Sequence, residues 1–240
     1  MDKDKPKLPS EILDSRPELK ETQIGIIKGI IGIVPHVGTM MNEILFEIPN
    51  RIYQARINEL VKILVREFMD LNDKAVTNEY LESESYFDFT RLMFENCIKI
   101  KSEEKRNALA KVYLDTVVNK ADFDTSKSKL FMDFVLELSP IQMNILRFIE
   151  RKKDSLVEIA KYIKFHECYN MTKSSYEIDA YEFKYYCNDL ESKALISLGD
   201  GLEDYESTAS RLVLEDHKLA SVKLTDLGKE FIKYIKNNNG

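Results

Sequence analysis

Apolar residues recur at three-and-four spacing from Arg51 to Leu71, and no other stretch restricts the possible folds as strongly. This spacing places side chains on one face of an α-helix, whereas a half-buried strand would need strict alternation. An apolar face of this length is stable in water only when other helices cover it, so the sequence predicts a helical bundle. The face consists of Ile52, Tyr53, Ile57, Leu60, Val61, Leu64, Val65, Phe68 and Leu71.

Three further helices are predicted before residue 138. The first spans about Glu84 to Ile100, and its inward side chains are expected to be Phe87, Leu92, Met93 and Ile98. The second begins at Ser102, whose hydroxyl can cap free amides ahead of two glutamates that suit the positive end of a helix. The third covers about Ser126 to Leu138. We therefore expect an all-α bundle over residues 24–138, preceded by a polar, proline-containing flexible arm over residues 1–23.

A new pattern starts at Ser139-Pro140-Ile141-Gln142, which is a capping box with proline at the first helical position. Helices are predicted from there to about Lys152, over residues 156–163 (LVEIAKYI) and over residues 177–193. Short β-type segments follow (ALIS, RLVLE and SVKL), and LTDLGKEFIKYI closes the chain as a helix. This order is that of a winged helix-turn-helix. The predicted fold is mainly α: an N-terminal helical bundle, then a winged helix-turn-helix-like domain with a small β-ribbon over residues 139–240.

Charge opposes nucleic-acid binding. The 240-residue chain has a formal net charge of −6, whereas affinity for polyanions comes largely from basic side chains. The predicted third helix of the second domain, residues 177–193, has five carboxylates against two lysines, and no basic residue lies between Gly199 and Ser210. A winged helix with such a surface is expected to contact protein. Its aromatic residues could stack bases but are interpreted as core and amphipathic edge, namely Tyr181, Phe183, Tyr185 and Tyr186.

No catalytic or cofactor-binding motif is present, and we predict a protein that is not an enzyme and uses no cofactor. Zinc-capable donors occur at His166, Glu167, Cys168, Cys187 and His217, but their spacings match no common structural site, so no metal is predicted. The three cysteines are far apart and no signal peptide opens the chain. We expect a cytoplasmic location and no disulfides.

Four of the eight glycines fall in GIIKGIIGIVPHVG, residues 25–38. If this segment is a helix, one of its sides carries Gly25, Lys28, Gly29 and Gly32, and isoleucines occupy the opposite side. Such a groove of glycines lets another backbone approach closely. Pro35 and Gly38 then favour a turn, so the segment is expected to form a hairpin.

The length of the glycine-rich helix favours packing within the bundle. Eleven residues rise only about 16 Å, roughly half the hydrocarbon thickness of a bilayer. The predicted contact surface is Gly25, Lys28, Gly29, Gly32, Pro35 and Gly38, for a neighbouring helix or a second copy of the chain. Association with a membrane surface, and hence a peripheral location, stays open as the alternative.

Several segments resemble the Abi-alpha family of bacterial abortive-infection proteins. They are SPIQMNILRFI, NDLESKALIS and VKLTDLGKEFIKYI, together with SEEKRNALAKVYLDTVV and FMDFVLELSP, so the resemblance covers about residues 80–236. The chain departs from the family at Ala194, where glycine is usual, and in the long acidic stretch GDGLEDYESTAS. VPHVGTMMNEILFEIPNRI more loosely resembles the entry of bacterial helical bundles related to HeLo-type cell-death domains.

The resemblances imply an anti-phage defence or growth-arrest protein and supply no catalytic residues. Two hypotheses of function follow. In the first, the chain acts by protein–protein interaction. The bundle is the output module, with membrane activity as an option, and the acidic second domain either senses a partner or holds the bundle inactive. In the second, the winged-helix order alone indicates a transcriptional regulator. No small-molecule substrate is predicted in either case.

Overall fold

The computed structural model describes residues 51–69, 80, 83–119, 127–153, 163–200 and 219–236. Within these ranges the protein is mainly helical, with one small antiparallel sheet, which confirms the predicted fold class. The contacts divide the chain into two compact units, one ending at Glu137 and the other beginning at Leu138. This division lies one residue from the predicted domain boundary. The glycine-rich segment lies outside the described residues.

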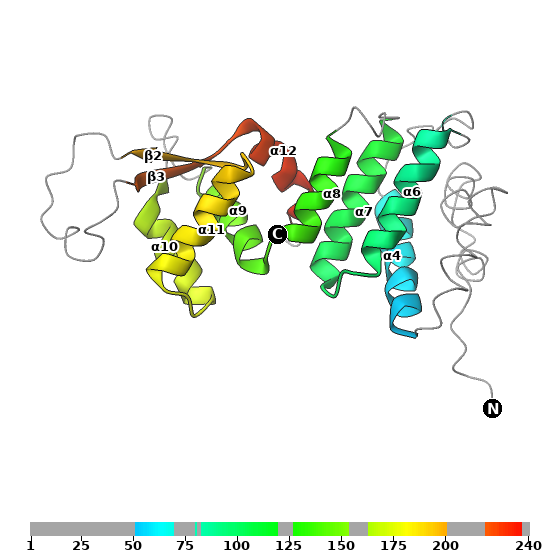
Figure 1. Cartoon of the computed structure of the whole chain (residues 1–240), viewed down its shortest axis with the longest axis horizontal. Helices are drawn as coiled ribbons and strands as arrows, with labels where there is room; N and C mark the ends of the chain where they lie inside the picture. The colour runs from blue at the N-terminus through cyan, green and yellow to red at the C-terminus, as the bar shows by residue number, and fades with distance from the viewer. Residues whose placement is uncertain are drawn as a thin grey trace, which may run out of the picture. The chain divides into compact units, whose positions relative to one another are not determined.

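The first unit contains α4 (Arg51–Met69), α6 (Glu84–Cys97), α7 (Glu103–Val118) and α8 (Ser128–Glu137), and α7 contacts the other three (Figure 1). A central helix must be apolar on most of its circumference. This is true of α7, whose two alanines also let neighbours approach closely. Its buried side chains are Arg106, Ala108, Leu109, Ala110, Val112, Tyr113, Leu114, Thr116 and Val117.

The predicted buried face agrees with the structure in the middle of α4 and differs from it on α6. Ile57, Leu60 and Leu64 of α4 are buried as expected, whereas Ile52 is 59% exposed. On α6, Met93 is buried, but Phe87, Leu92 and Ile98 are only half-buried, and the core face consists of Tyr86, Phe89, Thr90, Met93, Phe94, Asn96 and Cys97.

Polar side chains of α6 can lie in the core because their hydroxyl groups form hydrogen bonds with Tyr113 of α7. The Tyr113 hydroxyl lies 3.0 Å from Thr90 Oγ1 and donates to the Tyr86 hydroxyl at 3.3 Å. Burial raises the pKa of Tyr86 to about 12, because it disfavours the charged phenolate. An unpaired buried hydroxyl would be costly. The buried face of α6 recurs at three-and-four spacing from Tyr86 to Cys97, and the hydroxyl contacts satisfy the polar atoms that lie on it.

The second unit contains α9 (Pro140–Lys153), β1 (Ile163–Lys164), α10 (Phe165–Ser175), α11 (Ala180–Ser192), β2 (Ile196–Asp200), β3 (Leu219–Leu224) and α12 (Asp226–Ile235). The strands form an antiparallel sheet in the order β1-β3-β2, with β3 in the centre. Ile163 and Leu198 both pair with Val222, which is fully buried.

The predicted helix over residues 156–163 is wrong at its end, because Ile163 lies in β1 and helix α10 begins at Phe165. Residues 154–162, and the predicted strand RLVLE, lie outside the described residues. A strand of two residues has no detectable alternation. Its pairing with β3 depends on residues nearly sixty positions later in the chain, which local spacing does not encode.

Two predicted helix starts are confirmed atom by atom. Ser102 caps α7 by accepting a hydrogen bond from the amide of Lys105. At the start of α9, Ser139 Oγ accepts from the amide of Gln142 at 3.2 Å, and Gln142 Oε1 accepts from the amide of Ser139 at 2.8 Å. The capping box thus satisfies two backbone donors that a helix leaves free.

Helix α11 ends in a Schellman motif, whose C′ residue is Ala194. The amide of Leu195 donates to Leu190 O at 3.0 Å, and the amide of Ala194 donates to Glu191 O at 2.8 Å. Ala194 has a φ of 55°, in the left-handed region that glycine adopts freely and alanine does not. The departure from glycine noted in the sequence therefore falls on the one backbone position of this turn that favours glycine.

Ala194→Gly is expected to stabilise the second unit by about 1 kcal/mol, because the left-handed conformation costs alanine roughly that amount. Urea unfolding followed by circular dichroism measures the change. Ser192→Gly, two residues earlier and inside the helix, is the matched control and should destabilise the unit. Equal shifts in the same direction for both variants would contradict this account of Ala194.

Candidate protein-contact surface

Helix α11 is held in a fixed rotation by its caps and by its buried side. A capping box starts it: Asp179 Oδ1 accepts from the amide of Glu182 at 2.8 Å, and Glu182 Oε2 accepts from the amide of Asp179 at 3.0 Å. The ring of Phe183 lies fully buried, 5.0 Å from the ring of Phe165 and 5.5 Å from that of Tyr169. These contacts fix which side chains face the solvent.

Polar contacts attach the same helix to α9. Gln142, which caps α9 through its carbonyl oxygen, donates through Nε2 to Asp189 Oδ2 at 2.6 Å. Lys193 Nζ pairs with the other oxygen of Asp189 at 3.0 Å. The C-terminal half of α11 therefore cannot rotate without breaking the charge-assisted hydrogen bond from Gln142 of α9 to Asp189.

The exposed side of α11 carries two tyrosines one turn apart. Tyr181 is 79% exposed and Tyr185 is 68% exposed, whereas Phe183 between them is buried. The interpretation of the aromatic run as core and amphipathic edge is thus correct for Phe183 and for the half-buried Tyr186, and incomplete for these two rings. The signal in the sequence was the position of the tyrosines opposite the stripe of Phe183, Cys187 and Leu190.

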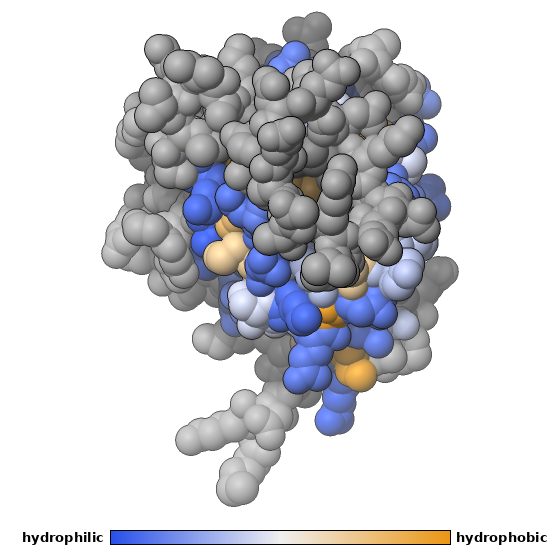
Figure 2. Space-filling model, turned by 90° about the vertical axis from the view of Figure 1, so that its left-hand side faces the viewer, coloured by the Kyte–Doolittle hydropathy of each residue, from blue (hydrophilic) through white to orange (hydrophobic). Residues whose placement is uncertain are grey.

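The other exposed residues of α11 are polar or charged, namely Glu182, Asn188, Glu191 and Ser192. From the side on which α10 lies in Figure 1, the described surface shows mainly hydrophilic residues with a few hydrophobic ones between them (Figure 2). Met171 of α10 is such an exposed apolar residue, at 50%. Amphipathic rings on a polar surface are typical of protein contact sites, where tyrosine is enriched.

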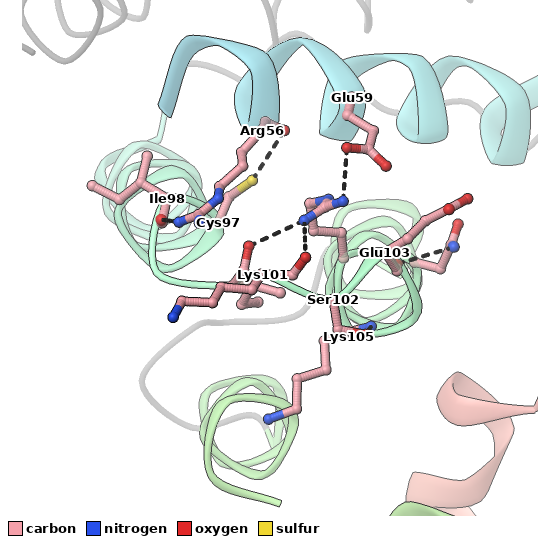
Figure 3. A network of polar contacts seen from close by, with 11 residues as sticks. Arg56, Glu59, Cys97, Ile98, Lys101, Ser102, Glu103 and Lys105 are labelled. Carbon is pink, nitrogen blue, oxygen red and sulfur yellow. Dashed lines mark hydrogen bonds and ion pairs between the residues drawn. The ribbon is translucent and has the colours of Figure 1, made fainter. Parts of the chain in front are cut away.

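A second candidate region is the polar network that joins α4 to α6 and α7 (Figure 3). The Arg106 guanidinium is almost completely buried and donates to Ile100 O at 3.1 Å, Lys101 O at 3.0 Å and Glu59 Oε2 at 2.7 Å. Figure 3 shows Glu59 reaching from α4 into this network, and Arg56 directed at the end of α6, where it donates to Ile98 O. The terminal nitrogens of Arg106 meet structural acceptors on two other segments, whereas its Nε has no partner, so the network joins the helices through these terminal nitrogens.

The cysteines are placed as buried core residues. Cys97, Cys168 and Cys187 are free thiols with no measurable exposure. Burial raises the pKa of Cys97 and of Cys168 to about 12, and raises that of Cys187 further. Within the described ranges no three His, Cys, Asp or Glu residues gather as metal ligands. His166 is exposed on α10, and His217 lies outside these ranges.

Alkylation of the three thiols by iodoacetamide at pH 8 is expected to be at least about tenfold slower in the folded protein than in urea. The reagent attacks the thiolate, and burial both hides the sulfur atoms and keeps them protonated. Mass spectrometry of timed samples gives the rate at each cysteine. Rapid labelling of Cys168 or Cys187 without urea would show that the core of the second unit opens.

The predicted contact surface on the glycine-rich segment is not described by the structure. Gly25, Lys28, Gly29, Gly32, Pro35 and Gly38 all lie within residues 1–50. In the part of the chain that is described, no helix has the length and apolar character needed to cross a membrane. Comparisons of the chain with protein-family models, curated proteins and solved structures find no match.

Proposed function

We propose that the second unit is a winged-helix-type domain whose α11 contacts another protein, and that the chain is a bacterial defence protein of the abortive-infection kind. The element order α9, β1, α10, α11, β2, β3, α12 and the strand order β1-β3-β2 support the first half of this proposal. The biological setting rests on the segments that resemble the Abi-alpha family, from about residue 80 to residue 236.

The exposed pair Tyr181 and Tyr185 carries the proposal of a protein partner. In a DNA-binding winged helix the equivalent helix enters the major groove, where cations must meet the phosphates. Here the helix and its entry, residues 177–193, have five carboxylates and two lysines. One of those lysines is already paired with Asp189. Exposed tyrosines with this charge fit a protein surface better than a polyanion.

The functional test is expression in a bacterial host with and without phage challenge. The double variant Tyr181→Ser/Tyr185→Ser should lose the growth or protection phenotype, because it removes both exposed rings without touching a buried side chain. Leu130→Ser, at an exposed apolar residue of α8 in the first unit, is the matched control and should behave as the unmodified chain. An unchanged phenotype in the tyrosine variant would remove α11 as the contact surface.

The first unit is proposed as the output module, with the glycine-rich segment as its contact surface. Gly29→Leu should block close approach of a second helix on that side. Chemical cross-linking of the purified protein tests association with a second copy, and leakage of dye-loaded liposomes tests membrane activity. If the variant changes neither readout, the segment is not a contact surface.

A transcriptional regulator is the second candidate, which the element order of the second unit favours. A mobility-shift experiment with host and phage DNA at low salt distinguishes the transcriptional regulator from the protein-contact proposal. Regulation by direct DNA reading requires a shift that depends on α11 and weakens with added salt. Lack of any shift leaves the protein-contact proposal.

A further inference from the structure

The exposed side of α11 is a continuous stripe. Tyr181, Tyr185, Asn188 and Ser192 are all exposed and follow one line along the helix, opposite the buried Phe183, Cys187 and Leu190. The two tyrosines form one end of the stripe, and the small polar residues form the other. A partner segment lying along α11 would therefore meet aromatic rings first and small side chains afterwards.

Carboxylates border the tyrosine end. Asp179 and Glu182 are exposed at the first turn, whereas Asp189, one turn beyond Tyr185, is already paired with Lys193. Each of the first two uses one oxygen in the capping box. The nearest basic side chain on the helix, Lys184, lies on the other edge of the stripe. The exposed carboxylates of Asp179 and Glu182 thus lie beside the tyrosine end.

We propose that this stripe, the α11 tyrosine face, binds a cationic segment of a partner protein that places two arginine side chains over the rings of Tyr181 and Tyr185. The inference rests on the proposed function, since it names the chemistry of the partner at the same surface. A guanidinium over an aromatic face is attracted by the ring quadrupole, and nearby carboxylates add to that attraction.

The protein already contains contacts of this kind. Lys173 Nζ lies 5.6 Å from the ring centre of Tyr169 on α10, and Arg56 Cζ lies 5.7 Å from that of Tyr53 on α4. Both distances are within the range in which the attraction is effective, about 6 Å. In Tyr181 and Tyr185 the rings are far more open, and an external cation can take the same position.

The geometry specifies the spacing of the cations. Tyr181 and Tyr185 are four residues apart, which corresponds to a rise of about 6 Å along the helix axis. Arginines at positions i and i+4 of a partner helix have the same separation and project from one face. Arginine is preferred to lysine because its planar guanidinium stacks on a ring and is more weakly hydrated.

The test uses the full chain and synthetic helical peptides based on alanine, each about 16 residues long. One peptide has Arg at i and i+4, a second has Lys there, a third has Glu, and a fourth has Arg at i and i+2, on different faces. A single tryptophan at the end of each peptide reports binding, because the protein contains none. Titrations are read from its fluorescence.

The i, i+4 arginine peptide is expected to bind, and the Lys and i, i+2 peptides to bind more weakly. Tyr181→Ala/Tyr185→Ala should weaken the arginine peptide by about tenfold, since each exposed cation–π contact contributes about two- to fivefold. Tyr181→Phe/Tyr185→Phe should retain binding, because phenylalanine keeps the ring face. Circular dichroism of both variants verifies that α11 is intact.

Equal binding of all peptides, no binding at millimolar concentration, or equal loss in the Phe and Ala variants would overturn the inference. A DNA duplex or an anionic vesicle that binds through the same tyrosines would overturn it as well. Failure here is distinguishable from failure of the proposed function. If the Tyr181→Ser/Tyr185→Ser variant loses the phage phenotype while no arginine peptide binds, the contact surface stands and the cationic partner does not.

Discussion

Gly228→Ala is expected to destabilise the second unit by about 3 kcal/mol, at the upper end for overpacking. A β-carbon at Gly228 would lie 2.0 Å from the carbonyl oxygen of Leu195 and 3.0 Å from its carbon. The obstacle is backbone, so no side-chain rotation can relieve the clash. The same carbonyl accepts a hydrogen bond from the amide of Thr225 at 3.2 Å, which ties it to the start of α12.

The sign of this effect is diagnostic. By helix propensity alone, alanine in place of glycine at the first turn of α12 would stabilise the helix by up to about 1 kcal/mol. Urea unfolding of the full chain measures the change, with Lys233→Ala, at an exposed position of the same helix, as the neutral control. A Gly228→Ala protein as stable as the control would show that α12 does not rest on the turn at Leu195.

Arg106→Met is expected to destabilise the first unit by about 3 kcal/mol. The substitution keeps much of the side-chain volume but removes the donors to Ile100 O, Lys101 O and Glu59. Buried acceptors that lose their donor cost about 1 to 3 kcal/mol each, and Glu59 loses its ion pair. The loss at Glu59 is moderated by water, because that side chain is 38% exposed.

Glu59→Gln is the matched control for Arg106→Met. It removes the charge, keeps an acceptor for Arg106, and should cost no more than about 1 kcal/mol. Thermal or urea unfolding of the three proteins separates the ion pair from the backbone contacts. If both variants lose the same free energy of unfolding, the hydrogen bonds to the carbonyls of Ile100 and Lys101 contribute little to stability, and the ion pair is the main stabilising contact of Arg106.

Local signals were read correctly where the determining atoms are close in sequence. The start of α9 depends on Ser139, Pro140 and Gln142 alone, and the cap of α7 on Ser102, so both were predictable. The apolar core of α4 was predictable for the same reason, because Ile57, Leu60 and Leu64 repeat at the helical period. Each of these features can be recognised within a window of a few turns.

Features that depend on distant residues were missed or shifted. The core face of α6 is an exception, because the buried stripe from Tyr86 to Cys97 recurs at helical spacing and is recognisable in the sequence. Strand β1 exists through its pairing with β3 and was read as the end of a helix. Tyr181 and Tyr185, by contrast, lie opposite the buried Phe183 at helical spacing, so the sequence does indicate their exposure.

The sequence by itself determined that the described chain is mainly helical, where most of its helices begin, and which residues form the middle of its cores. Helical period and capping are properties of neighbouring residues, and their free energies are local. The tertiary structure decided the existence of β1, the close approach of Gly228 to the carbonyl of Leu195, and the pairing of Tyr86 with Tyr113. These depend on contacts between segments far apart in the chain, where packing and the pairing of buried polar atoms outweigh local preference.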